Sequence, residues 1–70
     1  MDYKEINTFA AYVAEKIPKN TKTEKLFHDL LTLLVESDSY ISKQAKEARI
    51  ARYYKTIGLI RVHNSKDRAT

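Results

Sequence analysis

The sequence contains no cysteine and no tryptophan, and it has one glycine and one proline among its 70 residues. Without cysteine the chain can form neither a disulfide nor a thiolate zinc site, which is typical of proteins from a reducing compartment. With a single glycine it has no glycine-rich loop of the kind that cradles phosphate groups. These absences exclude disulfide-stapled folds, zinc fingers and the common nucleotide-binding loops.

A long apolar run is also absent. The longest one, residues 30–35, is interrupted by Thr32 and is far too short to span a bilayer. The first nine residues carry charges where a secretion signal needs an apolar segment. We therefore expect a soluble, cytoplasmic protein that does not bind membranes. A composition of 43% hydrophobic and 31% charged residues predicts that the chain folds.

The residue clusters that catalysis and metal binding require are missing as well. No nucleophile has a base next to it, and the two histidines, His28 and His63, lie in segments too different to suggest a shared metal site. Glu47 and Asp67 are single carboxylates among cations, which is typical of salt-bridge partners. A chain of this length also leaves little volume for a pocket. We therefore expect no enzymatic activity, no cofactor and no metal.

Charge is distributed unevenly along the chain. Residues 1–39 contain five lysines and seven acidic residues, a net charge of −2. Residues 40–70 contain eight basic and two acidic residues, a net charge of +6, and include all the arginines. Such a division is expected when the first part supports the fold and the second part contacts an anionic partner.

The first helix is predicted from its boundaries and its apolar spacing. Asp2 and Glu5 form a capping-box pattern at the start, and Pro18 ends the helix because the residue before a proline is steered out of helical geometry. The apolar stripe between them comprises Ile6, Phe9, Ala10, Val13 and Ile17. A short polar link follows, so the next helix should run roughly antiparallel to the first.

The segment of residues 21–35 is the most apolar part of the chain. Thr21 and Glu24 repeat the capping-box pattern at its start. Two adjoining rows form on a helix, one of Leu26, Leu30 and Leu33 and one of Phe27, Leu31 and Leu34, with Val35 beside them. A helix with two apolar rows needs two packing partners, so we expect it at the centre of the fold. His28 lies on its polar side and is expected at the surface.

Residues 40–57 contain no glycine or proline and predict a third helix, which Gly58 ends. Its apolar face changes sides part-way, from Ile41, Ala45 and Ala48 to Ile50, Tyr53, Tyr54 and Ile57. Either the helix is continuous and packs its second half on another subunit or target, or it bends near residues 48–50. The absence of glycine, asparagine and proline at that point favours the continuous helix.

The pattern changes after Gly58. Residues 59–62 predict either a short extended segment that folds back on the core or half of a strand pair across a dimer, and both remain open. Residues 64–70 have Ala69 as their single apolar residue, so we expect a disordered tail. The fold prediction is an all-α, three-helix domain over residues 1–63, monomeric or dimeric, with a short extended C-terminal segment.

Cations recur every three positions along the third helix. The series comprises Lys43, Lys46, Arg49, Arg52 and Lys55, with Arg61 further on. Such a row is either a solvated face that balances the acidic first part or a surface that neutralises phosphates and releases counterions, and both interpretations remain open. Arg49, Arg52 and Arg61 would also suit the edges of bases.

The stretch from Arg49 to Arg61, RIARYYKTIGLIR, resembles the RYY…IGL segment in the DNA-binding head of MerR-type regulators. Upstream, Tyr40, Ile41, Ala45 and Ala48 are similar to the first helix of that head. The glycine-containing turn of that head is missing here, and the similar stretch closes this chain instead of opening it. The resemblance is confined to residues 40–61 and implies DNA as the partner.

Together these observations predict a small basic helical protein that binds nucleic acid, with DNA as the expected form, through its third helix. The role would be regulatory or accessory, and the composition is typical of small bacterial, phage or plasmid proteins. The alternative is a helical protein-binding module, such as an inhibitor, adaptor or immunity protein. There an exposed patch of Ile50, Tyr53, Tyr54 and Ile57 would dock on a protein partner, or on a second copy as a homodimer.

Overall fold

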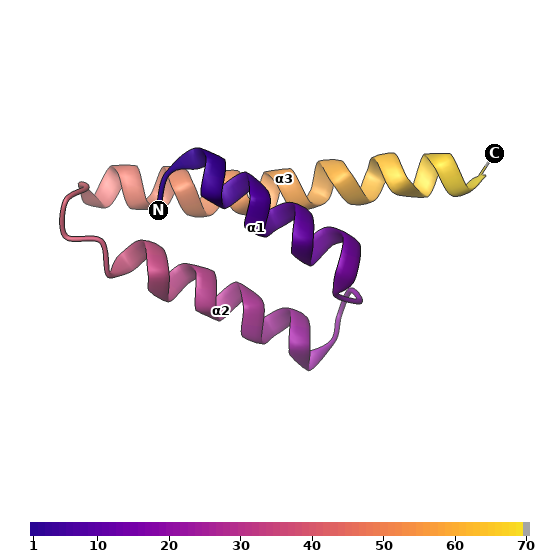
Figure 1. Ribbon diagram of the computed structural model, residues 1–70, viewed down its shortest axis with the longest axis horizontal. Coiled ribbons are helices and arrows are strands. Elements are labelled where there is room, and N and C mark those ends of the chain that lie inside the picture. Colours follow the sequence, from indigo (N-terminus) through magenta and orange to yellow (C-terminus); the bar gives the residue numbers. More distant parts are fainter. Residues whose placement is uncertain (70) are drawn as a thin grey trace.

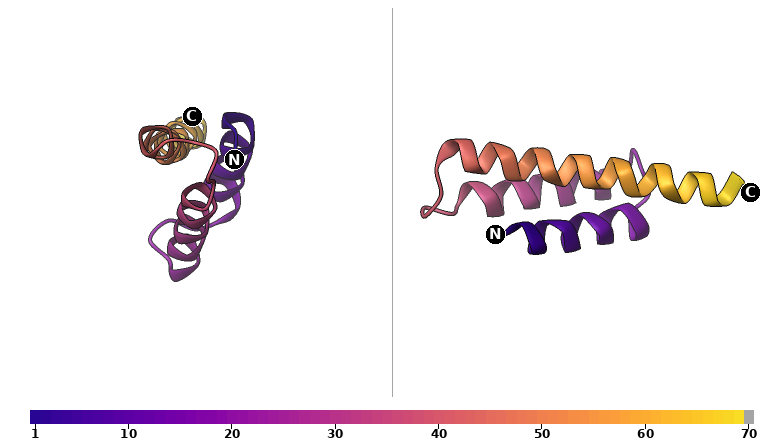
Figure 2. Two further views of the ribbon diagram at one scale, coloured as in Figure 1. Left: turned by 90° about the vertical axis from the view of Figure 1, so that its left-hand side faces the viewer. Right: turned by 90° about the horizontal axis from the view of Figure 1, so that it is seen from above.

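The protein is seen in a computed structural model that describes residues 1–69, with side chains described up to Ser65. It has three helices, α1 (Tyr3–Lys16), α2 (Lys22–Glu36) and α3 (Lys43–Ala69), and no strand in the described part of the chain (Figure 1). The predicted all-α, three-helix architecture is confirmed. Most of the contact between helices is made by α1 lying along α3, and α2 packs beside this pair (Figure 2).

The ends of α1 are determined by residues close by in the sequence. Asp2 accepts a hydrogen bond from the backbone N–H of Glu5 at 2.8 Å, and the Glu5 carboxylate accepts one from the N–H of Asp2 at 3.3 Å. This confirms the predicted capping box. Ile17, which precedes Pro18, is extended, with φ −108° and ψ 122°. Asn20 then turns the chain with a φ of 64°, a left-handed conformation that asparagine tolerates well.

The predicted capping box of α2 forms with one change of partner. Thr21 accepts from the N–H of Glu24 at 3.1 Å as expected. The Glu24 carboxylate accepts from the N–H of Asn20 at 3.1 Å, one residue before the position that the motif predicts. Its second oxygen is therefore free to bind elsewhere. At the far end of the α2–α3 connection, Ser42 caps α3 by accepting from the N–H of Ala45 at 3.1 Å.

The hydrophobic core is small and is shared by the three helices. Its buried side chains are Ile6, Ala10, Val13, Leu31, Val35, Tyr53 and Ile57. Phe9, Phe27 and Ile50 pack against it while remaining partly exposed. With so few buried side chains and no disulfide, the fold has little stability in reserve.

The prediction that α2 is covered on two sides is wrong. Leu31 and Val35 are buried against α1 and α3. The other row is open to solvent, and Leu26, Leu30 and Leu33 are 67%, 46% and 65% exposed, with Leu34 beside them at 43%. The physical reason is that α1 and α3 pack mainly on each other. They therefore offer α2 one surface instead of enclosing it.

The predicted end of α3 at Gly58 and the extended segment of residues 59–62 are also wrong. The helix is continuous through both and is assigned to Ala69, which confirms the unbent form of the third helix. Glycine costs a helix interior about 1 kcal/mol relative to alanine. Ile57 before it is buried in the core, and Arg61 after it binds α1 and α2. We infer that these contacts offset the cost.

The predicted domain boundary at residue 63 and the disordered tail of residues 64–70 remain predictions. The helix assignment of α3 continues past that boundary to Ala69. Side chains from residue 66 onward, and all of Thr70, lie outside the described part of the chain.

Candidate nucleic-acid interface

The cations predicted to contact phosphates divide into two groups. Lys46, Arg49 and Arg61 bind other parts of the chain. Lys43, Arg52 and Lys55 have exposed side chains. The regular spacing in the sequence therefore combines cations that stabilise the fold with cations that remain available to a partner.

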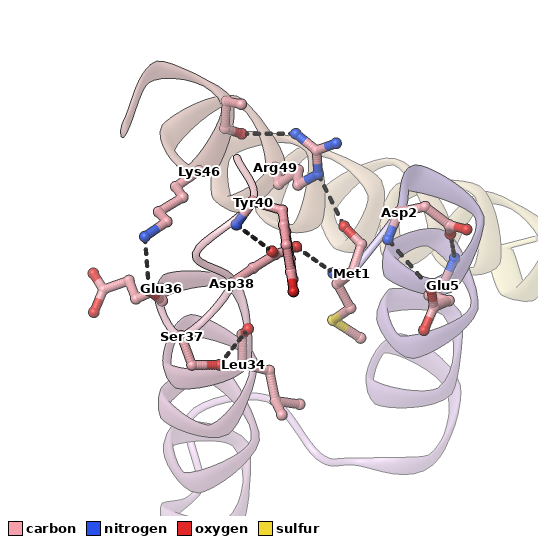
Figure 3. A network of polar contacts seen from close by, with 11 residues as sticks. Met1, Asp2, Glu5, Leu34, Glu36, Ser37, Asp38, Tyr40, Lys46 and Arg49 are labelled. Carbon is pink, nitrogen blue, oxygen red and sulfur yellow. Dashed lines mark hydrogen bonds and ion pairs between the residues drawn. The ribbon is translucent and has the colours of Figure 1, made fainter. Parts of the chain in front are cut away.

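Arg49 and Lys46 hold the N-terminus and the end of α2 against α3 (Figure 3). The Nε of Arg49 donates to the carbonyl oxygen of Met1 at 2.9 Å. Its guanidinium carbon lies 4.9 Å from the centre of the Tyr3 ring, a favourable cation–π geometry. The Nζ of Lys46 donates to the carbonyl oxygen of Glu36 at 2.8 Å, which satisfies an unpaired carbonyl in the last turn of α2.

Asp38 completes this network from the α2–α3 connection (Figure 3). Its carboxylate accepts hydrogen bonds from the N–H of Tyr40 at 3.0 Å and from the ammonium group of Met1 at 3.3 Å. The hydrogen bond from Tyr40 has the larger effect and that from Met1 the smaller, and together they hold the pKa of Asp38 below its usual value. The carboxylate therefore stays ionised and keeps the start of the chain beside α3.

Arg61 joins all three helices. One of its guanidinium nitrogens donates to the Glu24 carboxylate in α2, and the other donates to the carbonyl oxygen of Ile17 at the end of α1, at 3.1 Å. Glu24 is only 9% exposed. Burial alone would raise the pKa of Glu24, but the hydrogen bonds from Arg61 and from the N–H of Asn20 outweigh it, so the pKa lies below its usual value. Arg61 is thus engaged in a structural ion pair.

His28 is not the surface residue that the sequence predicted. It is half-buried, and its Nδ1 lies 2.7 Å from the Tyr53 hydroxyl. Its ring meets the rings of Tyr53 and Tyr54 edge-on, with centres 5.4 Å and 5.1 Å away. Burial, and then the neighbouring Tyr54, raise the pKa of the Tyr53 phenol, so the phenol keeps its proton and can donate it to His28.

The structure corrects the predicted docking patch on α3. Tyr53 and Ile57 lie in the core of the single chain, and Ile50 packs against that core. Tyr54 is 48% exposed. The second half of α3 is apolar because α1 and α2 pack on it within the same chain. The patch therefore does not exist as an exposed surface, and a protein partner or second copy would have to bind elsewhere.

Arg52 and Lys55, three residues apart, lie near each other on α3, whereas Lys43, nine residues before Arg52, lies about half a turn round the helix from it. Arg52 lies beside α1, because its Nε donates to the amide oxygen of Asn7 at 3.3 Å and its guanidinium carbon lies 5.6 Å from the centre of the Tyr3 ring. A groove of about 520 Å³ beside it is lined by Asn7, Arg52, Lys55, Thr56, Leu59 and Ile60. Glu47 is the single acidic residue between Lys43 and Ser65, the part of α3 whose side chains are described. The exposed surface of α3 therefore keeps a positive charge.

No protein-family model matches the chain, and neither curated proteins nor solved structures gave a match. The resemblance to MerR-type heads gains no support from the fold, because residues 43–61 form one continuous helix instead of two. Among the described residues, no helix is long and apolar enough to cross a membrane. Within the same residues, no three histidine, cysteine or acidic side chains gather in a way that would hold a metal ion.

We expect the free energy of unfolding to fall on acidification because of Glu24 and Asp38. Their pKa values in the folded protein lie below the usual 4.5 and 3.8, so the unfolded chain takes up protons first. The stability they contribute is complete above about pH 4.5 and is lost as the pH falls through the lowered values. Urea unfolding at about pH 7 and about pH 3 measures this difference.

Two glutamate variants test whether Glu24 causes the loss of stability at low pH. Glu24→Gln should shrink the difference in unfolding free energy between the two pH values, because its ionisation no longer changes. Glu15→Gln, an exposed carboxylate on α1, should leave the difference unchanged. Equal effects of the two variants would contradict a special role for Glu24.

Proposed function

We propose that the protein binds nucleic acid through the exposed cations of α3, in a regulatory or accessory role. The observation that carries this proposal is that Lys43, Arg52 and Lys55 are exposed on α3, with Glu47 as the single acidic residue in the part of that helix whose side chains are described. Exposed cations neutralise phosphates and release the counterions bound to them, and this release drives binding.

The small side chains on α3 support close approach to a nucleic-acid backbone or groove. Small residues, Ala48, Ala51 and Gly58, lie exposed between the cations. With 27 residues, α3 is about 40 Å long, and a single helix fits the major groove of B-form DNA. Gln44 and Arg52 carry the donors that contact base edges in such a groove.

The division of the cations lowers the expected salt dependence. If the three exposed cations each meet one phosphate, the logarithm of the binding constant should fall with the logarithm of salt concentration with a slope of about −3 on duplex DNA. The full series of six cations would give a slope of about −5. Binding of this kind is weak and depends little on sequence, with dissociation constants on the order of 1 to 100 µM.

We expect the double variant Arg52→Gln with Lys55→Gln to flatten this salt dependence. Removing two phosphate contacts should reduce the slope by about 2 and weaken binding at low salt. Fluorescence anisotropy of labelled duplex DNA, single-stranded DNA and RNA, each across a salt series, measures the slope and identifies the preferred form.

The control is Lys4→Gln with Lys19→Gln. Both lysines are exposed but lie on α1 and on the α1–α2 link, and their replacement lowers the net charge from +4 to +2, as the test variant does. The control should keep the wild-type slope. Equal losses in the two variants would show that only total charge matters, and an absence of binding at about 50 mM salt would refute the proposal.

The open leucine row on α2 favours a protein partner as the second candidate function. Burying each half-exposed leucine in a complex would contribute about 1 kcal/mol. Such an association would depend weakly on salt, because apolar burial is not screened. Nucleic-acid binding that fails at low salt, together with a complex that Leu33→Glu abolishes, would favour this candidate.

A further inference from the structure

The apolar row on α2 has the periodicity of a helix that pairs with another helix. Thr23, Leu26, Leu30, Leu33 and Ser37 recur at alternating intervals of three and four residues along the chain. These are the a and d positions of a seven-residue repeat, which place one row of side chains along a helix–helix seam. Because the buried residues of α2 lie on its other side, this seam is left open within the single chain.

The residues that flank the seam show which way a second helix would run. In this register Phe27 and Leu34 occupy the e positions, and Lys22, Asp29 and Glu36 occupy the g positions. When two helices pair antiparallel, e faces e and g faces g. When they pair parallel, e faces g, and apolar flanks would meet charged ones. The e and g positions thus select an antiparallel orientation.

The charged flank is complementary to itself in that orientation. Lys22 at the start of α2 would lie opposite Glu36 at the end of a second α2, and this contact would occur twice. Asp29 would lie close to its own counterpart at the centre, which is the one unfavourable pair. All three side chains are exposed in the single chain. A surface that matches itself after a half-turn is what a twofold-symmetric dimer requires.

We propose that two copies of this chain associate through antiparallel pairing of their α2 helices, with Leu26, Leu30 and Leu33 of each copy buried in the seam. The interface differs from the one expected at Ile50, Tyr53, Tyr54 and Ile57 of α3, most of which pack in or against the core. It is independent of nucleic-acid binding, because the exposed cations lie on another helix. Short seams of this length hold dimers in the micromolar range of dissociation constants.

Sedimentation velocity of the full chain, from about 1 µM to about 1 mM, tests the association. The wild-type protein should shift from monomer to dimer, and Leu33→Glu should stay monomeric. Leu59→Glu is the matched control, because Leu59 is equally exposed, 62% against 65%, but lies on α3. Far-UV circular dichroism checks that each variant keeps its helices. A wild-type monomer throughout, or a dimer that Leu59→Glu disperses and Leu33→Glu does not, overturns the proposal.

Cross-linking tests the orientation without relying on a disruptive variant. The chain has no cysteine, so single-cysteine variants and a short thiol cross-linker report one distance at a time. In the Asp29→Cys variant, the cysteines of the two copies should become cross-linked to each other. Lys22→Cys should not link to itself but should link to Glu36→Cys when the two are mixed. Efficient self-linking of Lys22→Cys, or no linking in any of these samples, contradicts antiparallel α2 pairing.

Discussion

Tyr53→Ala is expected to leave most of the protein unfolded at room temperature. Tyr53 is fully buried and is the largest side chain in the core. Its ring lies 5.8 Å from that of Phe9, and its hydroxyl binds His28. Removing a buried aromatic ring costs about 3–5 kcal/mol, which is close to the whole stability that a core of this size supplies. Urea unfolding followed by far-UV circular dichroism measures the loss.

The neighbouring tyrosine is the control for this variant. Tyr54 is 48% exposed, and Tyr54→Ala should lower the free energy of unfolding by about 1 kcal/mol because only its packing on His28 and Tyr53 is lost. The two adjacent tyrosines are alike in the sequence, so the comparison isolates the effect of burial. Equal destabilisation by the two variants would contradict the placement of Tyr53 in the core.

Arg61→Met is expected to destabilise the fold by about 2 kcal/mol. The change leaves the nearly buried Glu24 carboxylate without its cation and removes the hydrogen bond to Ile17. Breaking a fully buried pair costs about 3–5 kcal/mol, and the partial exposure of Arg61 reduces that figure. Chemical unfolding of Arg61→Met, Glu24→Gln and the double variant forms a thermodynamic cycle that isolates the interaction.

The double variant should be clearly more stable than the sum of the single losses predicts, with a coupling of about 1 kcal/mol. The control is Lys55→Met, whose lysine is exposed, and it should change the free energy of unfolding by less than about 0.5 kcal/mol. Additive losses in the cycle, or an effect of Lys55→Met as large as that of Arg61→Met, would contradict a structural role for Arg61.

The helix boundaries could be predicted from the sequence where they depend on near neighbours. The capping box of Asp2 and Glu5 and the stop before Pro18 involve residues no more than three positions apart, and both form as expected. The predicted end of α3 at Gly58 also rested on near neighbours, and it was wrong. It failed because contacts distant in sequence, above all those of Arg61 with Glu24 and Ile17, stabilise the helix beyond the glycine.

Periodicity on α2 predicted two apolar rows but not which of them would be covered. That choice depends on where α1 and α3 lie in space. Since those two helices pack on each other, the row with Leu31 is the one that packs on them among the described residues. The heptad spacing of the other row was present in the sequence. That spacing becomes informative once the structure shows that the row is exposed in the described part of the chain.

The candidate interface was predicted as a set of cations without a distinction between their roles. Spacing cannot show that Arg49 binds Met1, 48 residues away in sequence, or that Lys46 binds the end of α2. The sequence predicted Glu24 only as part of a capping box. In the structure its carboxylate accepts from the N–H of Asn20 and also binds Arg61, a contact that the sequence analysis did not predict. Long-range pairing of this kind needs the structure.

The most direct test measures two properties on the same two variants, Arg61→Met and the double variant Arg52→Gln with Lys55→Gln. One property is the free energy of unfolding, and the other is the salt dependence of binding to labelled duplex DNA under conditions where both variants are folded. We expect Arg61→Met to lose stability and keep the wild-type slope, and the double variant to keep stability and lose about 2 units of slope. A flattened slope for Arg61→Met at unchanged stability, or an unchanged slope for the double variant, would contradict the division of the α3 cations into structural and nucleic-acid-binding groups.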